Sequence, residues 1–480
     1  GCTSLPSPAV TVNAKPIATL SGSNTVCIGT SINITPSTGG TWVSSNSSVA
    51  SIDNEGLITG VSVGSATFTY TSTSTGCISN PSSTVTVSTR PSASISGSTS
   101  LCIGTTSTLI PSSGGVWVSS NPAVASVDGS GVVTGLSNGT AHFTFTQYTT
   151  GCSSDATNNI IVNEKPIVSI TGATSVCLGF STTISPTTGG TWVSSNTNVA
   201  TVTNSGVVTG IAPGTATFVY TLNATNCISN ATGLITVNAL PVPNVTGGTS
   251  ICNGTTTTLS PTTGGTWVSS NPGVATVTDD GTVTGITPGS ASFTFTQTST
   301  SCVSPPSAVV TVNTKPIASI SGASTICEGT TTTLSPAVGG SWTSSSPLVA
   351  SVTSGGVVTG LEGGSATFIY KQTSTGCDSD PTASVIINPK PDILVTGPDS
   401  ICVDGNSQLS PTSGGSWASL TPDIASVTSG GLITALSAGN AYFRYTESLT
   451  GCLSDSSQLI KIADKPLAIL TGPSDICIGN

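Results

Sequence analysis

Short β-branched runs alternate along the chain with clusters of Gly, Ser, Asn and Pro, a pattern typical of strands joined by turns. In residues 65–71, Ala66, Phe68 and Tyr70 share one face and Thr67 and Thr69 share the other, which predicts a half-buried strand. Residues 16–90 show seven such runs and no helix. The pattern predicts strands at 16–22, 31–36, 41–45, 49–53, 57–61, 65–71 and 83–89.

A 75-residue period governs the whole chain, because the phrase "GGTWVSSN" at 39–46 returns in close variants at 114, 189, 264, 339 and 414. A unit of this size is about one small β domain. We therefore expect six complete repeats, at 16–90, 91–165, 166–240, 241–315, 316–390 and 391–465. Residues 1–15 match the C-terminal end of a repeat and residues 466–480 match the start of one, so we expect a section of a longer protein.

One tryptophan per repeat is placed at the start of the third predicted strand, after a Gly-Gly turn. Burial in the core of a β-sandwich is the favoured interpretation, and an exposed platform for stacking sugars is the alternative. The six residues are Trp42, Trp117, Trp192, Trp267, Trp342 and Trp417.

The chain has few charges: 6% of its residues are charged, against roughly 25% in an ordinary soluble domain. A dilute net charge of −10 gives no basic stripe for nucleic acid, and no apolar run is long enough for a membrane helix. Fourteen cysteines with no Met and one His favour disulfides in an extracellular setting. The Cys and His spacings of zinc sites are absent, so we expect no metal and no cofactor.

No set of candidate catalytic residues recurs from repeat to repeat. His142 is the only histidine and lies on the polar face of a predicted strand, so a Ser-His or Cys-His pair could exist in one repeat at most. Scattered acids fall in turns, and only "CDSDP" at 377–381 hints at a calcium site. We expect a protein that is not an enzyme.

The linkers between repeats are short and end in proline, which fixes φ and restricts the residue before it, so we expect a stiff, rod-like array. The position before the proline is basic in six of seven linkers, as a solubilising charge or as a cation docked on carbonyls or an acidic group of the next repeat. The junction residues are Lys15, Pro16, Arg90, Pro91, Lys165, Pro166, Lys315, Pro316, Lys390, Pro391 and Lys465, with Leu240 as the exception.

The core of each repeat, "WVSSNSSVASIDNEGLITGVSVGSATFTYT" in the first, resembles the bacterial immunoglobulin-like group 2 domain. The flanking "VCIG" and "TGC" are more similar to Cys-bearing repeats of the polycystic-kidney-disease type in giant secreted bacterial proteins. The resemblance implies an all-β tandem array of seven-stranded Ig-like β-sandwiches, placed outside the cell. Such domains form the stalks of intimin- and invasin-type adhesins, and the family contributes no catalytic residues.

The cysteines alternate at gaps of 25 and 50 residues, and three pairings respect the repeat. In an Ig-like sandwich Cys27 and Cys77 lie at opposite ends, which favours disulfides between repeats with a separation of 125, such as Cys27 with Cys152 and Cys102 with Cys227. Pairing within a repeat, at a separation of 50, and pairing of Cys77 with Cys102 or between chains stay open. The full set is Cys2, Cys27, Cys77, Cys102, Cys152, Cys177, Cys227, Cys252, Cys302, Cys327, Cys377, Cys402, Cys452 and Cys477.

Two structural functions follow from these observations. The first is a disulfide-stapled section of an extracellular bacterial fibre or surface filament, with copies of itself as partners through lateral or end-to-end assembly. The second is the inert stalk of a cell-surface adhesin that binds glycans or other cells through regions outside this sequence. Carbohydrate-binding modules are a weaker third interpretation, which requires exposed Trp rings.

Overall fold

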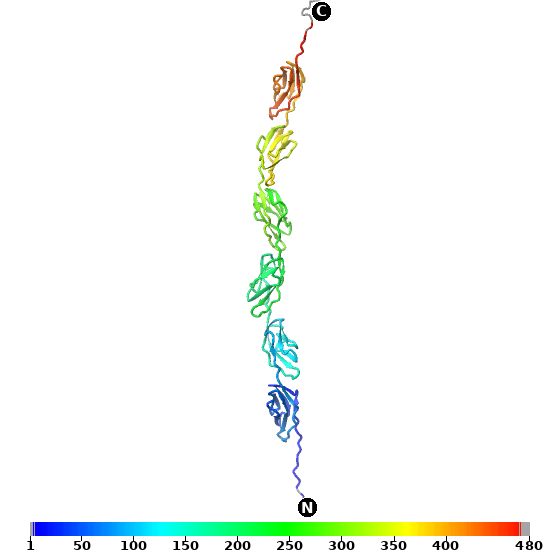
Figure 1. The fold of residues 1–480 in the computed structure, drawn as a ribbon, viewed down its shortest axis with the longest axis vertical. Helices are drawn as coiled ribbons and strands as arrows, with labels where there is room; N and C mark the ends of the chain where they lie inside the picture. The colour runs from blue at the N-terminus through cyan, green and yellow to red at the C-terminus, as the bar shows by residue number, and fades with distance from the viewer. Residues whose placement is uncertain (1–2, 4, 470, 472–480) are drawn as a thin grey trace, which may run out of the picture. The chain divides into compact units, whose positions relative to one another are not determined.

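A computed structural model describes residues 3, 5–469 and 471 of the 480-residue chain (Figure 1). The described residues form 54 β-strands and no helix, and so they contain no helix long and apolar enough to cross a membrane. The chain divides into two compact units, Gly1–Ala239 and Leu240–Asn480. The first unit holds the periods at 16–90, 91–165 and 166–240, here repeats 1 to 3, apart from the last residue Leu240, and the second unit holds repeats 4 to 6.

Nine strands make up repeat 1, two more than the sequence pattern predicts. They are β1 (Thr19–Ser21), β2 (Thr25–Cys27), β3 (Ser31–Thr35), β4 (Gly40–Ser44), β5 (Ala50–Ile52), β6 (Leu57–Gly60), β7 (Gly64–Ala66), β8 (Phe68–Ser72) and β9 (Val85–Ser88). The other five repeats carry the same nine strands at equivalent positions, as β10–β18 through β46–β54. Their first strand has two residues instead of three.

The strands of repeat 1 form three sheets, in the orders β1-β3-β6-β5, β2-β9-β7 and β4-β8. The sequence pattern places Cys27 in a turn between the predicted strands at 16–22 and 31–36, and this is wrong, because Thr25–Cys27 forms β2 and pairs in parallel with β9. The single strand expected at 65–71 is wrong as well, since it breaks at Thr67. Residues before the break pair with β9 and residues after it pair with β4. Alternation cannot reveal such a change of sheet, because the buried face continues through the break.

One hydrophobic core fills each repeat. In repeat 1 it contains Trp42, Phe68 and Tyr70 with aliphatic residues from both larger sheets, and Phe68 has no exposed surface. Trp42 lies opposite Tyr70 across β4 and β8, with ring centroids 5.1 Å apart. The all-β tandem array of Ig-like repeats is confirmed, with nine strands in place of seven.

The Gly-Gly pair before each tryptophan has a steric reason. Gly39 has a φ of +82°, a conformation that other residues adopt only with strain. A Cβ on Gly40 would approach the carbonyl oxygen of Thr71 to 2.2 Å, because β8 crosses directly beside it. Strand β4 therefore begins at the second glycine, and Trp42 is its central residue, not its first.

The outer edge of β8 is closed by serine hydroxyls. The backbone N–H of Tyr70 donates to Ser79 Oγ at 2.9 Å, and that of Phe68 donates to Ser82 Oγ at 3.1 Å. The N–H groups of the two serines donate back to the carbonyls of the same two strand residues. An edge satisfied in this way offers no template for pairing with another chain. The arrangement also fixes the loop that carries Cys77.

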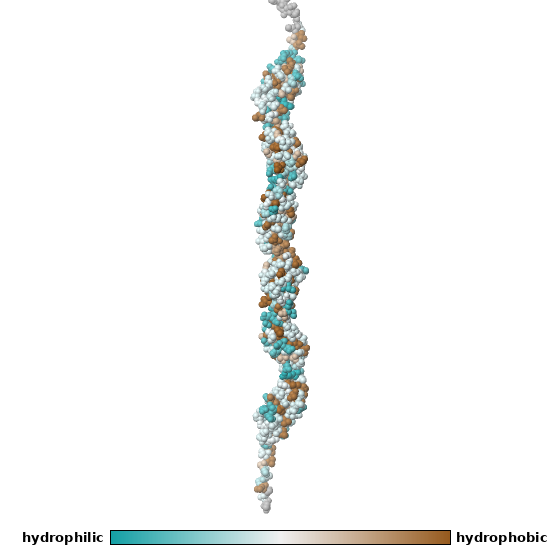
Figure 2. All heavy atoms as spheres, turned by 90° about the vertical axis from the view of Figure 1, so that its left-hand side faces the viewer, coloured by the Kyte–Doolittle hydropathy of each residue, from teal (hydrophilic) through white to brown (hydrophobic). Residues whose placement is uncertain are grey.

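The surface shown in Figure 2 is mostly near neutral in hydropathy, with apolar side chains in small groups. Val43 and Val118, at the same position of two repeats, are 58% and 54% exposed. Small, separated apolar groups are ordinary on a soluble surface.

Candidate functional site

Neighbouring repeats within each unit are joined by disulfides across their linker. Cys27 bonds Cys152 with a Cα–Cα distance of 5.7 Å, and Cys102 bonds Cys227 at 5.6 Å. The second unit contains Cys252–Cys377 and Cys327–Cys452. Each bond has a sequence separation of 125 and links the earlier cysteine of one repeat to the later cysteine of the next. This is the separation that the sandwich topology favours over pairing within a repeat.

The other cysteines differ in state. Cys77 and Cys402 are free, whereas Cys177 and Cys302 are disulfide-bonded. The proposed pairing of Cys77 with Cys27 or with Cys102 is therefore wrong. Cys2 and Cys477 lie outside the described residues.

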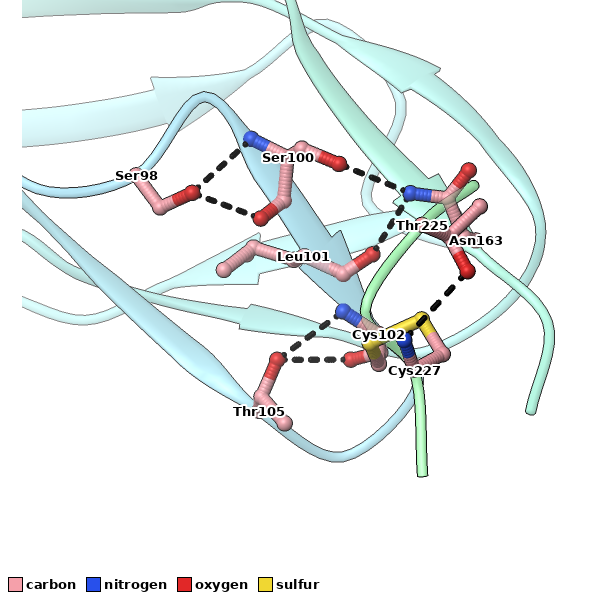
Figure 3. Close-up of a disulfide and its surroundings, with 8 residues drawn as sticks. All are labelled: Ser98, Ser100, Leu101, Cys102, Thr105, Asn163, Thr225 and Cys227. Carbon is pink, nitrogen blue, oxygen red and sulfur yellow. Dashed lines mark hydrogen bonds between the residues drawn. A yellow bond between two sulfur atoms is a disulfide. The ribbon is translucent and has the colours of Figure 1, made fainter. Parts of the chain in front are cut away.

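The earlier cysteine of each disulfide lies at the end of a short strand, and Figure 3 shows its surroundings for Cys102. This residue ends β11 (Ser100–Cys102), which pairs in parallel with β18 (Ile160–Asn163). Its N–H donates to Thr105 Oγ1 at 3.0 Å, and the same hydroxyl donates to its carbonyl at 2.9 Å. The parallel strand that sequence reasoning missed is thus the element that positions the cysteine.

The start of the linker is fastened to the same strand. Asn163 is the last residue of β18, and its amide nitrogen donates to Ser100 Oγ at 2.9 Å and to the carbonyl of Leu101 at 3.1 Å (Figure 3). Repeats 3 and 4 repeat this contact with Asn238 and Asn313. The polypeptide that leaves a repeat is therefore tied to the disulfide-bearing strand at its first residue.

The later cysteine lies in a closed turn. Gly151 adopts a φ of +68°, and its N–H donates to the carbonyl of Gln147. The carbonyl of Cys152 then accepts from the Gln147 N–H, and the N–H of Cys152 donates to Thr150 Oγ1 at 3.2 Å. Cys152 has no exposed surface. Both ends of the disulfide are therefore presented by backbone that its own repeat holds in place.

Ion pairs add a second contact at three junctions. Arg90 pairs with Asp155 at 2.5 Å, and Lys315 and Lys390 pair with Asp380 and Asp455 at 2.8 and 2.6 Å. In each case the cation precedes the linker proline and the acid lies three residues after the later cysteine of the next repeat. At these three junctions the basic residue thus docks on an acidic group of the next repeat, as the second interpretation of the junction cations expects. The carboxylates are 78–86% exposed, so each pair contributes less than about 1 kcal/mol.

Other junction cations behave differently. Within the described residues, Lys15 and Lys165 form no ion pair, and Lys465 pairs with Asp404 of its own repeat at 2.6 Å. The linker prolines of the six complete repeats, Pro16 through Pro391, are half-buried. The disulfide, not the charge, is the bond that the junctions within each unit share.

The tryptophans face inward. Their exposed fractions are 5–7%, and Trp42 Nε1 donates to the carbonyl of Pro36 at 2.9 Å. A ring that is buried against Tyr70 and bonded at its nitrogen offers no face to a sugar. The structure thus places Trp42, Trp117, Trp192, Trp267, Trp342 and Trp417 in the cores.

Acidic side chains do not converge on a cation site in the described part of the chain. Asp378, in the segment that hinted at calcium, lies 3.9 Å from Lys371, and Asp380 pairs with Lys315. His142 is exposed, and the expectation that it lies on a strand is wrong, because it falls in the break between β16 (Gly139–Ala141) and β17 (Phe143–Gln147). The hydroxyl of Ser130 and the backbone N–H of Val132 hold the pKa of Asp128 below its usual value of 3.8, as expected for a turn acid.

Comparison with known proteins identifies the domain type. Residues 8–77 and 82–157 match the bacterial Ig-like domain (group 2) family. These segments are tandem bacterial Ig-like domains, and the same nine strands recur in the later repeats.

Ice-binding protein 1 of Shewanella frigidimarina is 27% identical over 508 aligned residues, which cover 90% of this chain and 54% of that protein. The chain thus spans about half the length of this curated relative. Among solved structures, invasin, a bacterial integrin-binding protein, is 15% identical over 73% of this chain and 79% of its own, with a TM-score of 0.21. Domains 1–6 of the surface layer protein SbsC are 14% identical over 74% and 64%, with a TM-score of 0.16.

Disulfides persist in oxidising compartments outside the cytosol. Together with the bacterial Ig-like domains, they identify this chain as an extracellular repeat protein.

Proposed function

We propose that this array of bacterial Ig-like domains is a covalently braced spacer, which bears tension and holds functional parts of a longer extracellular protein at a fixed separation. The observation that carries the proposal is the disulfide between consecutive repeats, such as Cys27–Cys152. It runs beside the peptide linker, so two covalent connections cross the junction where an ordinary array has one. Two connections at separate points oppose bending, which a single linker permits.

The proposed role is structural and not enzymatic. The uninterrupted 75-residue spacing supports it, because a constant rise per repeat matters to a spacer and not to a flexible tether. The relative's name describes ice binding, an activity that a stalk of this kind would present away from the cell surface. In that arrangement the binding region belongs to other parts of the full-length protein.

The distance between two repeats tests the spacer. Spin labels at the exposed positions of Val43 and Val118 report on repeats 1 and 2. In the intact chain we expect a narrow distance distribution, and the double variant Cys27→Ser with Cys152→Ser should broaden it. The matched control is Cys102→Ser with Cys227→Ser, which removes a disulfide but leaves the junction between the labels braced. Equal widths in all three proteins would refute the proposal.

Lateral assembly into a filament is the second candidate. Four repeats expose a valine at the same position, namely Val43, Val118, Val193 and Val268, at 54–58%. The serine-closed edge of β8 removes one route for such assembly. Electron microscopy of the native protein separates the two candidates, because a spacer gives single chains one domain wide and a filament gives ordered bundles.

A further inference from the structure

The junction between repeats 5 and 6 contains a cavity of about 290 Å³. Its walls come from both repeats: Glu328 and Thr330 follow the earlier cysteine of repeat 5, Lys390 belongs to the linker, and Arg444, Ser454 and Asp455 belong to repeat 6. The Cys327–Cys452 disulfide closes one side, since Cys327 also lines the cavity. This volume approaches the lower end of the range for small-molecule sites.

Two residues of this cavity are specific to this junction. Glu328 replaces the Ile, Leu, Asn or Val that other repeats carry at its position. Arg444 lies on β53 (Phe443–Glu447) and replaces the Thr, Val or Ile of the other five repeats. Charges at two otherwise neutral positions, one in each of two neighbouring repeats, thus meet in a single cavity.

The two residues do not neutralise each other directly. Within the described residues neither Glu328 nor Arg444 forms an ion pair, whereas Lys390 and Asp455 pair at 2.6 Å. Arg444 Nε is buried and has no hydrogen-bond partner. Within the described residues the rest of the Arg444 guanidinium has no hydrogen-bond partner either, and because Arg444 lines the cavity, an acceptor bound there would satisfy its accessible N–H donors.

The chemistry of an acceptor follows from the side chains. A guanidinium presents its N–H donors in a planar fork that matches a carboxylate. Glu328 adds an acceptor that repels a simple anion but receives hydrogen bonds from hydroxyl or ammonium groups, and Thr330 and Ser454 supply hydroxyls. The ion pair with Asp455, assisted by the charge of Glu328, raises the pKa of Lys390, which keeps this side chain cationic.

We propose that this junction cavity binds a small ligand that carries a carboxylate beside hydrogen-bond donors, with Arg444 holding the carboxylate and Glu328 receiving the donors. Sugar acids and amino acids share this chemistry. The site goes beyond the spacer function, because a spacer needs no charge at either position. It occurs once in the array, since the other repeats lack both residues.

Isothermal titration of the whole oxidised chain tests the site, with D-glucuronate and glycine as probes and D-glucose and acetate as controls. We expect one binding event per chain for glucuronate or glycine, with affinity at least tenfold above that of either control. Glucuronate alone identifies a sugar-acid site, and glycine alone identifies an amino-acid site.

The variant Arg444→Thr should abolish the binding, and it carries the residue that repeats 1, 2 and 4 use at this position, so the fold tolerates it. Glu328→Asn, which installs the residue of repeat 4, should weaken the binding of glucuronate or glycine by at least tenfold but should not weaken the binding of acetate, which Glu328 repels. Absence of binding by the intact chain, or binding that Arg444→Thr leaves unchanged, would overturn the proposal.

Discussion

The covalent path through the first unit predicts how far it can be stretched. The polypeptide runs from Cys27 to Cys227 through three repeats, but the two disulfides offer a shorter route. Tension that enters at Cys27 crosses to Cys152, runs back along repeat 2 to Cys102 and crosses to Cys227. The only polypeptide on that route is the segment 102–152.

The lengths of these routes differ enough to measure. At about 3.5 Å per extended residue, the roughly 200 residues of the reduced segment reach ~700 Å, and the roughly 50 residues of the oxidised route reach ~175 Å. Removing one disulfide, by Cys102→Ser with Cys227→Ser, leaves Cys27–Cys152 followed by the polypeptide 152–227. With about 75 residues on its path, this single-bridge variant should stop at about 260 Å.

Optical tweezers can read these limits in the whole chain. Peptide ligation tags inserted at Ser23 and Ala231, both in exposed segments, attach the handles just outside the two cysteines. Force is raised until the three repeats unfold, first under oxidising conditions and then after reduction. We expect the contour length to increase from the intact chain to the single-bridge variant and again to the reduced chain.

The single-bridge variant is the decisive measurement. Bonds within repeats, such as Cys27 to Cys77, would also leave about 50 residues of extensible polypeptide in the intact segment, so the intact chain cannot distinguish the two pairings. In the variant, however, bonds within repeats would leave about 150 residues and a limit of about 525 Å. A measured limit of about 525 Å in place of about 260 Å would refute the pairing between repeats and the spacer built on it.

Three further substitutions test local parts of the structure. Ser229→Ala removes the acceptor of the Tyr220 N–H at the β-edge of repeat 3, which costs about 1–3 kcal/mol. Hydrogen exchange of that amide should therefore speed up about fivefold or more, while the equivalent amides of other repeats stay unchanged. The pKa of Asp128 is lowered in the folded state, so its turn is fully stabilised above pH 4 and loosens as the pH falls through the folded-state pKa. Amide exchange at 130–132 should therefore speed up in acid. Asp128→Thr, which installs the residue of the next four repeats, should remove this dependence on acid. Asp155→Asn breaks the ion pair with Arg90 and should lower stability by less than about 1 kcal/mol at low salt and not at all in high salt, so a large loss on thermal unfolding would contradict the exposed geometry.

Some features were readable from residue order because they depend on spacing within one repeat. Alternation identified Ala66, Phe68 and Tyr70 as one buried face, and the structure buries all three. The Gly39-Gly40 pair recurs before the tryptophan of each repeat because β8 passes beside Gly40 and leaves no room there for a side chain. A six-fold internal repeat makes such constraints visible without any second sequence.

Other features depend on which segments meet in space. The parallel strand Thr25–Cys27 is short and has no periodic pattern of its own, and it exists because β9 passes beside it. The serine caps of β8 and the break at Thr67 likewise follow from the folding of distant segments onto one edge.

The cavity at Arg444 could not be predicted from the sequence for the same reason. Glu328 and Arg444 stand far apart in the sequence and look like unrelated substitutions in two repeats. Residue order specifies the fold of each repeat, because its hydrophobic period, its turns and its tight glycines are local. The folded junction specifies which charges and cysteines face each other, because only there do two repeats share one surface.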